Sequence, residues 1–247
     1  VRDGKDTEAS DLLLKTSEKL ISQCKGISGF IVKRGSPSCG SGSTNLYNEK
    51  CNVKSHKQDG LFVQALKATF PHLPIEDEGR LNDPSIQEHF IKHVHLYHSA
   101  QKMLDNSTHI SQLQAFHVKH KMILRLHHSQ NQKVLGQLIA QGSMASGFDD
   151  LKQQYFNLFI QSFDKMVTPA HHYTLLQRCF RGINHNLSKL DREDIQENLK
   201  AYLEGLIPLS TPMTLLRHYA KRYRQAFITK QSYLYPYPDE LGLMRSV

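Results

Sequence analysis

The feature that most constrains the fold is a change of pattern near residue 83. Before it, short apolar segments rich in β-branched residues alternate with helical segments; after it, helical periodicity continues with no convincing strand. An alternation of helices and strands is typical of a parallel α/β sheet. We therefore predict an α/β fragment with a partial parallel sheet at residues 1–82, followed by an all-α helical domain at residues 83–247.

The first part contains too few strands for a whole domain. We predict helices at 7–23 and 60–70, strands at 29–33 and 73–76, and one Gly/Ser-rich loop over 34–59. In the first helix, Ala9, Leu13, Thr16 and Leu20 form the expected apolar stripe. Parallel sheets need both faces covered and typically have about five or six strands. Since the chain opens on Val1, we expect the rear portion of an α/β domain whose start is missing.

The second part opens with Asp83-Pro84, a helix cap followed by proline at the first helical position. Asp191 is expected to cap a later helix, with Leu190 packing on Ile195, and Gly205 to end that helix. The aromatic tail 232–239 is expected to pack over the helices. The predicted helices span 84–103, 110–127, 132–141, 149–166, 168–183, 191–205 and 212–223.

Composition narrows the functional classes. Lys and Arg number 31 against 23 Asp and Glu, which gives a formal charge of +8 and favours anionic partners such as nucleotides or RNA. A merely basic soluble protein is the alternative. No apolar run approaches the roughly 18 residues of a membrane span, and no signal peptide is visible. Four scattered cysteines do not make a disulfide framework, so we expect a reducing, cytoplasmic location.

The loop after the first predicted strand gathers reactive and small residues. It reads Lys33-Arg34-Gly35-Ser36-Pro37-Ser38-Cys39-Gly40. Open α/β sheets bind ligands at the carboxyl ends of strands, and small residues let backbone N–H groups approach an anion. The charges of Lys33 and Arg34 are expected to lower the pKa of the Cys39 thiol, and thiolate is the form that ligates iron. A flexible turn with an incidental cysteine is the alternative.

This loop and the opening Val1-Arg2-Asp3-Gly4-Lys5-Asp6-Thr7 resemble the thiouracil desulfidase (TudS-like) family. The resemblance implies an α/β protein that holds a [4Fe-4S] cluster through three cysteines. The fourth iron would accept sulfur from a thiolated pyrimidine or its nucleotide in a non-redox desulfuration. Cys39 matches the third ligand and would act with Ser36 and Ser38. Lys33, Arg34, Gly35 and Gly40 would bind substrate.

The other cysteines depart from the family pattern. Cys24, Cys51 and Cys179 do not occupy family ligand positions, and the two N-terminal ligand motifs are absent. Cys24 and Cys179 are expected to be structural thiols, whereas Cys51 could approach Cys39 along the same loop. We expect no cluster in this chain alone, which would be inactive by itself. A non-catalytic protein that binds nucleotides or RNA is the alternative.

Two groups in the helical part could form a further site. His117, His120 and Lys121 lie on the helix 110–127, where histidines three residues apart can ligate a metal or serve as core imidazoles. His89 and His93 could complete such a site only from a facing helix. Arg217 and His218 lie on a basic helix that either matches the helix dipole or contacts phosphate or RNA. Tyrosines of the tail could provide platforms for bases.

The helical part also resembles a known family. Phe116-His117-x-x-His120-Lys121, Leu135-Gly136-Gln137-Leu138 and Thr214-Leu215-Leu216-Arg217-His218 look like YbgA-type domains, as does the ending from Gln231 to Leu241. The resemblance covers about residues 86–247. It implies a domain of unassigned activity that follows the desulfidase-like domain in many bacterial proteins. We expect this domain to cover the cleft of the first domain or to recruit its substrate.

Overall fold

The computed structural model describes residues 6–24, 26–47, 53–142 and 147–238. It divides into two compact units, Val1–His98 and Ser99–Val247. Helix α3 (Pro84–Asn106) contributes residues to both units. The compact units divide within α3 and not at residue 82. This division does not test the domain boundary expected after residue 82, which remains a prediction. Residues 1–5 of the opening motif, Cys51 and the end of the tail from residue 239 lie outside the described residues.

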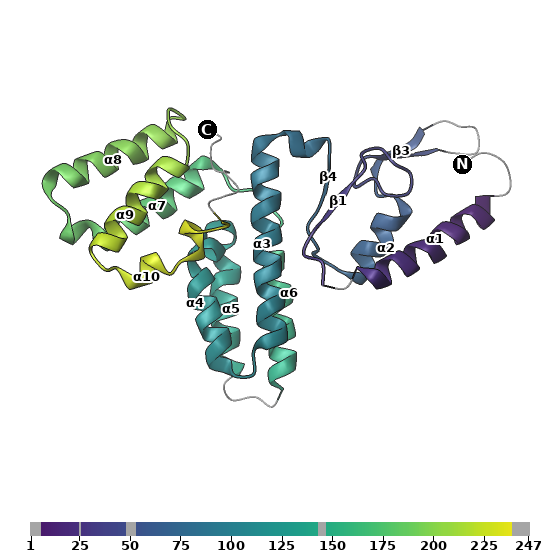
Figure 1. Cartoon of the computed structure of the whole chain (residues 1–247), viewed down its shortest axis with the longest axis horizontal. Helices are drawn as coiled ribbons and strands as arrows, with labels where there is room; N and C mark the ends of the chain where they lie inside the picture. Colours follow the sequence, from purple (N-terminus) through teal and green to yellow (C-terminus); the bar gives the residue numbers. More distant parts are fainter. Residues whose placement is uncertain (1–5, 25, 48–52, 143–146, 239–247) are drawn as a thin grey trace. The chain divides into compact units, whose positions relative to one another are not determined.

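The first unit contains the predicted partial sheet. Strands β1 (Phe30–Val32) and β4 (Ile75–Asp77) pair in parallel, with Phe30 opposite Ile75 and Val32 opposite Asp77. Figure 1 shows α1 beside α2 in the same unit. An α/β fragment that precedes a helical region is therefore confirmed. Its other elements are α1 (Asp6–Gln23), β2 (Thr44–Tyr47), β3 (Val53–Gln58), α2 (Leu61–Thr69) and the 3₁₀ helix η1 (Arg80–Asn82).

The loop predicted over 34–59 is wrong in its second half. Strands β2 and β3 form an antiparallel hairpin there, with irregular register. The sequence of β3, Val53-Lys-Ser-His-Lys-Gln58, is almost entirely polar. It therefore lacks the apolar alternation by which half-buried strands are recognised. The hairpin matters for the site because it brings Asp59 and Gly60 back to the loop after β1.

One face of the β1–β4 sheet is covered, whereas the opposite face is exposed at Ile31. The rings of Phe30 and Phe62 lie 5.5 Å apart, so that α2 packs on the covered face. Ile31 is 57% exposed, and neighbouring strand residues point to opposite faces.

In α1, the predicted apolar stripe is wrong: Leu13 and Leu20 are exposed, while Ser17 and Ile21 are buried. A small polar residue therefore shares the buried face, which apolar spacing alone does not reveal.

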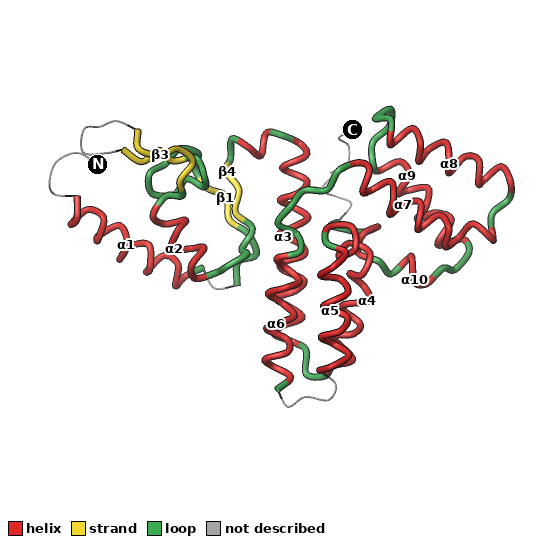
Figure 2. The backbone as a smooth tube through the Cα atoms, turned by 180° about the vertical axis from the view of Figure 1, so that it is seen from behind, coloured by secondary structure: helices red, strands yellow, loops and turns green. Residues whose placement is uncertain are grey.

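The second unit is helical throughout its described part, as Figure 2 shows. Helices α4, α5 and α6 pack in sequence, and α7, α8 and α9 form a neighbouring group. The helices are α4 (Ile110–His127), α5 (Ser129–Gly142), α6 (Phe148–Gln161), α7 (Pro169–Ile183), α8 (Lys189–Leu203), α9 (Ser210–Arg222) and α10 (Ala226–Thr229), with 3₁₀ helices η2 (Asn184–Asn186) and η3 (Ser232–Leu234).

The helix ends confirm some of the predicted caps and correct others. Asp83 Oδ1 accepts hydrogen bonds from the backbone of Ser85 and Ile86 at the start of α3. Gly205 has a φ of +73° after α8, as a helix-ending glycine should. Asp191 is not the N-cap of α8: Ser188 is, and Asp191 completes its capping box. Leu190 is exposed, so the predicted packing on Ile195 does not form.

The tail packs on the second unit as predicted. Tyr233, Leu234 and Tyr237 are buried. Gln231 is buried as well, and its amide accepts from Met122 N at 3.0 Å and donates to Val118 O at 2.8 Å. Met122 N and Val118 O lie one turn apart on α4, and in a regular helix they would form a hydrogen bond with each other. The tail is therefore attached to α4 by hydrogen bonds as well as by apolar contacts.

Among the described helices, none is both long enough and apolar enough to traverse a bilayer.

Candidate functional site

The Cys39 loop, residues 34–43, leaves the carboxyl end of β1. Ser36, Ser38 and Cys39 lie together in it. The Cys39 Sγ is 3.2 Å from Ser36 Oγ, and Ser36 Oγ is 3.1 Å from Ser38 Oγ. The backbone N–H of Cys39 also donates to Ser36 Oγ at 3.3 Å. Three of the predicted site residues therefore form one hydrogen-bonded group around a partly exposed thiol.

Backbone hydrogen bonds attach this loop to the start of α2. Gly60 N donates to Gly40 O and Phe62 N donates to Ser38 O, each at 2.8 Å. Gly60 has an ordinary extended backbone, which any residue could adopt. Glycine is required at this position because there is no room for a side chain. A Cβ at Gly60 would overlap the carbonyl group of Ser38 and lie 2.7 Å from Cys39 N. The close approach of these two segments fixes the backbone on either side of Cys39.

Side chains from the hairpin complete the support of the loop. Asp59 Oδ1 accepts from Gly42 N at 2.7 Å, while Asp59 Oδ2 pairs with Lys67 Nζ at 2.7 Å. Thr44 Oγ1 donates to Ser36 O at 2.8 Å. The roles of Thr44, Asp59 and Gly60 are not evident from the sequence, because they depend on the hairpin. The Asp59-Gly60 pair directly before a helix is the signal that could have indicated a turn there.

The basic pair at the start of the loop is arranged differently from the prediction. Lys33 Nζ forms an ion pair with Glu78 Oε1 at 2.9 Å, and the backbone N–H of Arg34 donates to Glu78 Oε2 at 2.9 Å. Glu78 directly follows β4, whose carboxyl end lies beside that of β1 because the two strands are parallel. The charge of Lys33 is therefore compensated within the site.

Hydrogen bonds control the pKa of the Cys39 thiol. Partial burial raises this pKa, but hydrogen bonds from Ser36, Ser38 and the backbone of Lys33 outweigh the effect and hold it below its usual value. Glu78 acts in the opposite direction. The expectation of a lowered pKa agrees with the structure, whereas the expected cause, the positive charges of Lys33 and Arg34, is wrong. Hydroxyl groups that donate to sulfur favour the thiolate.

We predict that Cys39 is alkylated by iodoacetamide faster in the wild type than in Ser36→Ala. Removing the hydroxyl removes a hydrogen bond that stabilises the thiolate, so the midpoint of the rate against pH should move upward. Mass spectrometry of the labelled peptides measures the rate at each pH. Buried Cys179, whose pKa burial raises to about 12, should stay unlabelled. Identical profiles for Cys39 in both proteins would contradict this account.

The described residues do not fit a complete [4Fe-4S] cluster. No group of three His, Cys, Asp or Glu side chains suited to a metal occurs among them. Cys24 Sγ lies 3.3 Å from the carbonyl oxygen of Leu20 at the end of α1, and Cys179 is buried on α7 in the other unit. What the described part of the chain offers to such a cluster is one thiolate, Cys39.

His117 and His120 of α4 are core residues. His117 Nδ1 is 3.0 Å from Tyr155 Oη, and the His120 ring lies 4.4 Å from that of Phe116. His120 is 3% exposed. Burial lowers the pKa of His117 to about 4 and that of His120 to about 3, with the nearby Lys121 and Lys119 acting in the same direction. Both rings are neutral at pH 7 and serve packing.

Protonation of these histidines should destabilise the helical unit in acid. The unfolded imidazole binds a proton below about pH 6.5 and folded His120 does not, so stability falls as pH drops from 7.5 to 5.5. His120→Phe should remove about 1.4 kcal/mol of this pH dependence. Urea unfolding followed by circular dichroism measures it, with exposed His185→Asn as the matched control. An unchanged pH dependence in His120→Phe would refute the core assignment.

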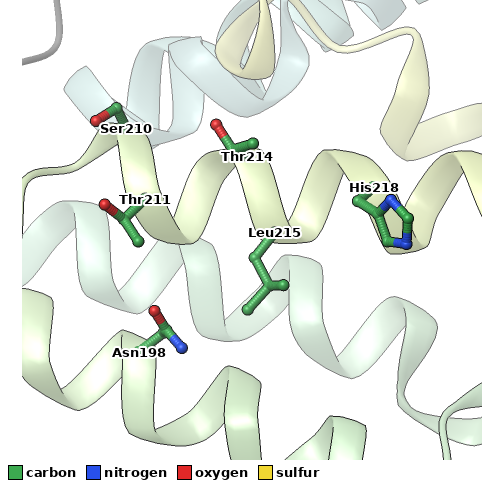
Figure 3. A pocket seen from close by; sticks show the side chains of 6 residues that line it. All are labelled: Asn198, Ser210, Thr211, Thr214, Leu215 and His218. Carbon is green, nitrogen blue, oxygen red and sulfur yellow. The ribbon is translucent and has the colours of Figure 1, made fainter.

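The remaining predicted residues of the helical part are exposed or half-buried. Lys121 is exposed on α4, while Arg217 and His218 lie on α9. They therefore do not form one site with the buried His117 and His120. His218 belongs to an open groove of about 570 Å³ between α8 and α9, which Figure 3 shows. Its lining residues are Asn198, Ser210, Thr211, Thr214, Leu215 and His218.

Comparisons with known proteins match the two parts of the chain separately. The family model described as 2-thiouracil desulfurase matches residues 1–78, which include the Cys39 loop. The model described as a protein of unknown function, DUF1722, matches residues 121–238. The uncharacterized protein YbgA of Escherichia coli K12 is 21% identical over 131 residues, 53% of this chain and 78% of YbgA. No solved structure gives a significant match. Residues 1–78 are therefore similar to 2-thiouracil desulfurase, and the helical part that follows is similar to YbgA.

Proposed function

We propose that Cys39 provides one thiolate to a site that removes sulfur from a thiolated pyrimidine. The observation that carries this proposal is the lowered thiol pKa of Cys39 in a tightly held loop at the carboxyl end of β1. The match to 2-thiouracil desulfurase over the same residues supports the substrate class. In the net reaction, water replaces the sulfur: the C=S group becomes C=O and hydrogen sulfide leaves.

The residues around Cys39 have separate roles in this proposal. Ser36 and Ser38 stabilise the thiolate through hydrogen bonds from their hydroxyl groups, which lower the pKa of Cys39. The backbone at Gly35 and Gly40 shapes the loop against Ser43 and α2. Lys33 is paired with Glu78 and holds the two strand ends together. Exposed Arg34, whose side chain lies beside Gly79, is the cation that remains for an anionic nucleotide substrate.

An iron–sulfur centre would need more thiolates than the described residues place at Cys39. A [4Fe-4S] cluster held by three cysteines requires two besides Cys39, so the ligand set must be completed from outside the described residues. We therefore expect the 247-residue chain to release little sulfide by itself. Iron analysis after anaerobic reconstitution with Fe²⁺ and sulfide should find well under four irons per chain. A stoichiometric, stable cluster in this chain would contradict the proposed need for further ligands.

The proposed reaction is tested on the protein purified anaerobically from its native source. It should release sulfide from 4-thiouracil or from 4-thiouridine monophosphate, with uracil or uridine monophosphate as the second product. Comparing the two substrates distinguishes a base from a nucleotide substrate, and Arg34→Gln should impair the nucleotide more than the base. Iron-containing protein that releases no sulfide from either compound would refute the proposed reaction.

A further inference from the structure

Tyr235 is an exposed aromatic ring flanked by two cations. The Arg217 guanidinium carbon lies 5.3 Å from the ring centroid, and Lys221 Nζ lies 5.6 Å from it. Arg217 and Lys221 are one turn apart on α9, so both approach the ring from that helix. Tyr235 remains 36% exposed while its neighbours Leu234 and Tyr237 are buried. A rigidly anchored segment therefore presents one ring at the surface beside two positive charges.

The groove between α8 and α9 adjoins this cluster. Thr214 lines the groove and accepts a hydrogen bond from Arg217 Nη2 at 3.3 Å. His218 lines the groove as well and lies between Arg217 and Lys221 in sequence. As Figure 3 shows, the groove residues run along α9 with Asn198 opposite them on α8. We call the groove together with Arg217, Lys221 and Tyr235 the α9 face.

The charge of the α9 face is not compensated at Lys221. Within the described residues, neither Lys221 nor the nearby Arg224 has a carboxylate within 4 Å. Arg222 is different, because it lies near Asp191, whose pKa is lowered mainly by hydrogen bonds from Tyr219 and Ser188 and to a smaller extent by the charge of Arg222. Cations in the last turn of α9 also match the helix dipole. The helix dipole explains why cations occur at the end of α9. It does not explain why an exposed aromatic ring lies beside Arg217 and Lys221.

We propose that the α9 face binds single-stranded RNA, a function beyond the desulfuration at Cys39. Arg217 and Lys221 would contact backbone phosphates, and a base would stack on the side of Tyr235 that faces away from α9. The amide, hydroxyl and imidazole groups of the groove would hydrogen-bond ribose 2′-hydroxyls, which distinguish RNA from DNA. An open groove beside a positive patch favours an extended polyanion over a small enclosed ligand.

Binding is tested with fluorescein-labelled decauridylate and the 247-residue chain, using fluorescence anisotropy over a range of salt. Tyr235→Ala should weaken binding by about 5- to 150-fold, while Tyr235→Phe keeps the ring and should bind nearly as the wild type does. Arg217→Gln with Lys221→Gln should reduce the slope of log K against log salt by about 1.4, from about 0.7 for each lost phosphate contact. Lys221→Gln alone should reduce it by about 0.7.

The control removes two charges elsewhere, by Lys119→Gln with Lys133→Gln on α4 and α5. These residues are exposed, and their loss should leave affinity nearly unchanged. The proposal is overturned if this control weakens binding as much as the α9 variant does. It is also overturned if decadeoxyuridylate binds as tightly as RNA, or if uridine monophosphate competes equally well per nucleotide. Circular dichroism of each variant verifies that the helical structure is retained.

Discussion

Replacing Cys39 by serine is expected to lower sulfide release from 4-thiouracil by at least about a hundredfold in the native protein, since even residues that only hydrogen-bond to the ligands of a metal typically contribute 10- to 100-fold. Serine preserves the size of the side chain and the hydrogen-bonding capacity toward Ser36. It lacks the soft thiolate that binds iron. The loss should therefore appear in turnover and iron content, with little change in stability.

Cys24→Ser is the matched control for this variant. Cys24 is partly exposed like Cys39, but its thiol hydrogen-bonds to the carbonyl group of Leu20 in α1. Its replacement should leave sulfide release within about twofold of the wild type, as expected of a surface substitution away from the site. Full activity in Cys39→Ser, or an equal loss in Cys24→Ser, would show that Cys39 has no special role.

Gly60→Ala is expected to destabilise the first unit by about 1–3 kcal/mol, the usual cost of inserting a methyl group where no space exists. The atoms in its way are the backbone of Ser38 and Cys39, which cannot rotate aside as a flexible side chain could. The Cys39 loop must shift, so the hydrogen bonds that stabilise the thiolate should weaken. Hydrogen–deuterium exchange of residues 28–78 and the alkylation rate of Cys39 measure the two effects.

Gly79→Ala provides the control for a glycine with more tolerant surroundings. A Cβ there would lie 3.1 Å from Arg34 Cδ, in a flexible and exposed side chain, and 3.2 Å from Asp77 Oδ1, so that these neighbours need to shift by only a few tenths of an ångström. We expect little change in exchange or in alkylation of Cys39 for this variant. If Gly60→Ala and Gly79→Ala behave alike, the contact between α2 and the Cys39 loop does not position the thiol.

The sequence correctly predicted those features of the fold that depend on residues close to one another in the chain. The cap at Asp83, the parallel strands after a short apolar run and the glycine end of α8 all follow from residues adjacent to the feature. The β2–β3 hairpin could not be predicted because β3 is polar and is held by backbone pairing. Ser188 was missed as the cap of α8 because Asp191, three residues later, is an equally good capping residue by type.

The candidate site shows the same division. The sequence identified Cys39, Ser36 and Ser38, whose mutual contacts span three residues. It could not identify Gly60, which approaches Cys39 only after the chain has formed the hairpin. It also could not predict the ion pair of Lys33 with Glu78, because that pair depends on the parallel pairing of β1 and β4. Residues that act over long sequence separations require the tertiary structure.

Iron-dependent protection of Cys39 tests the central claim most directly. The native protein is purified anaerobically and treated with iodoacetamide before and after iron is removed by a chelator, and labelling of Cys39 and Cys24 is quantified by mass spectrometry. We predict that Cys39 is protected while iron is bound and labelled after its removal, whereas labelling of Cys24 does not change. Equal labelling of Cys39 in both states would contradict its assignment as an iron ligand of the desulfurase site.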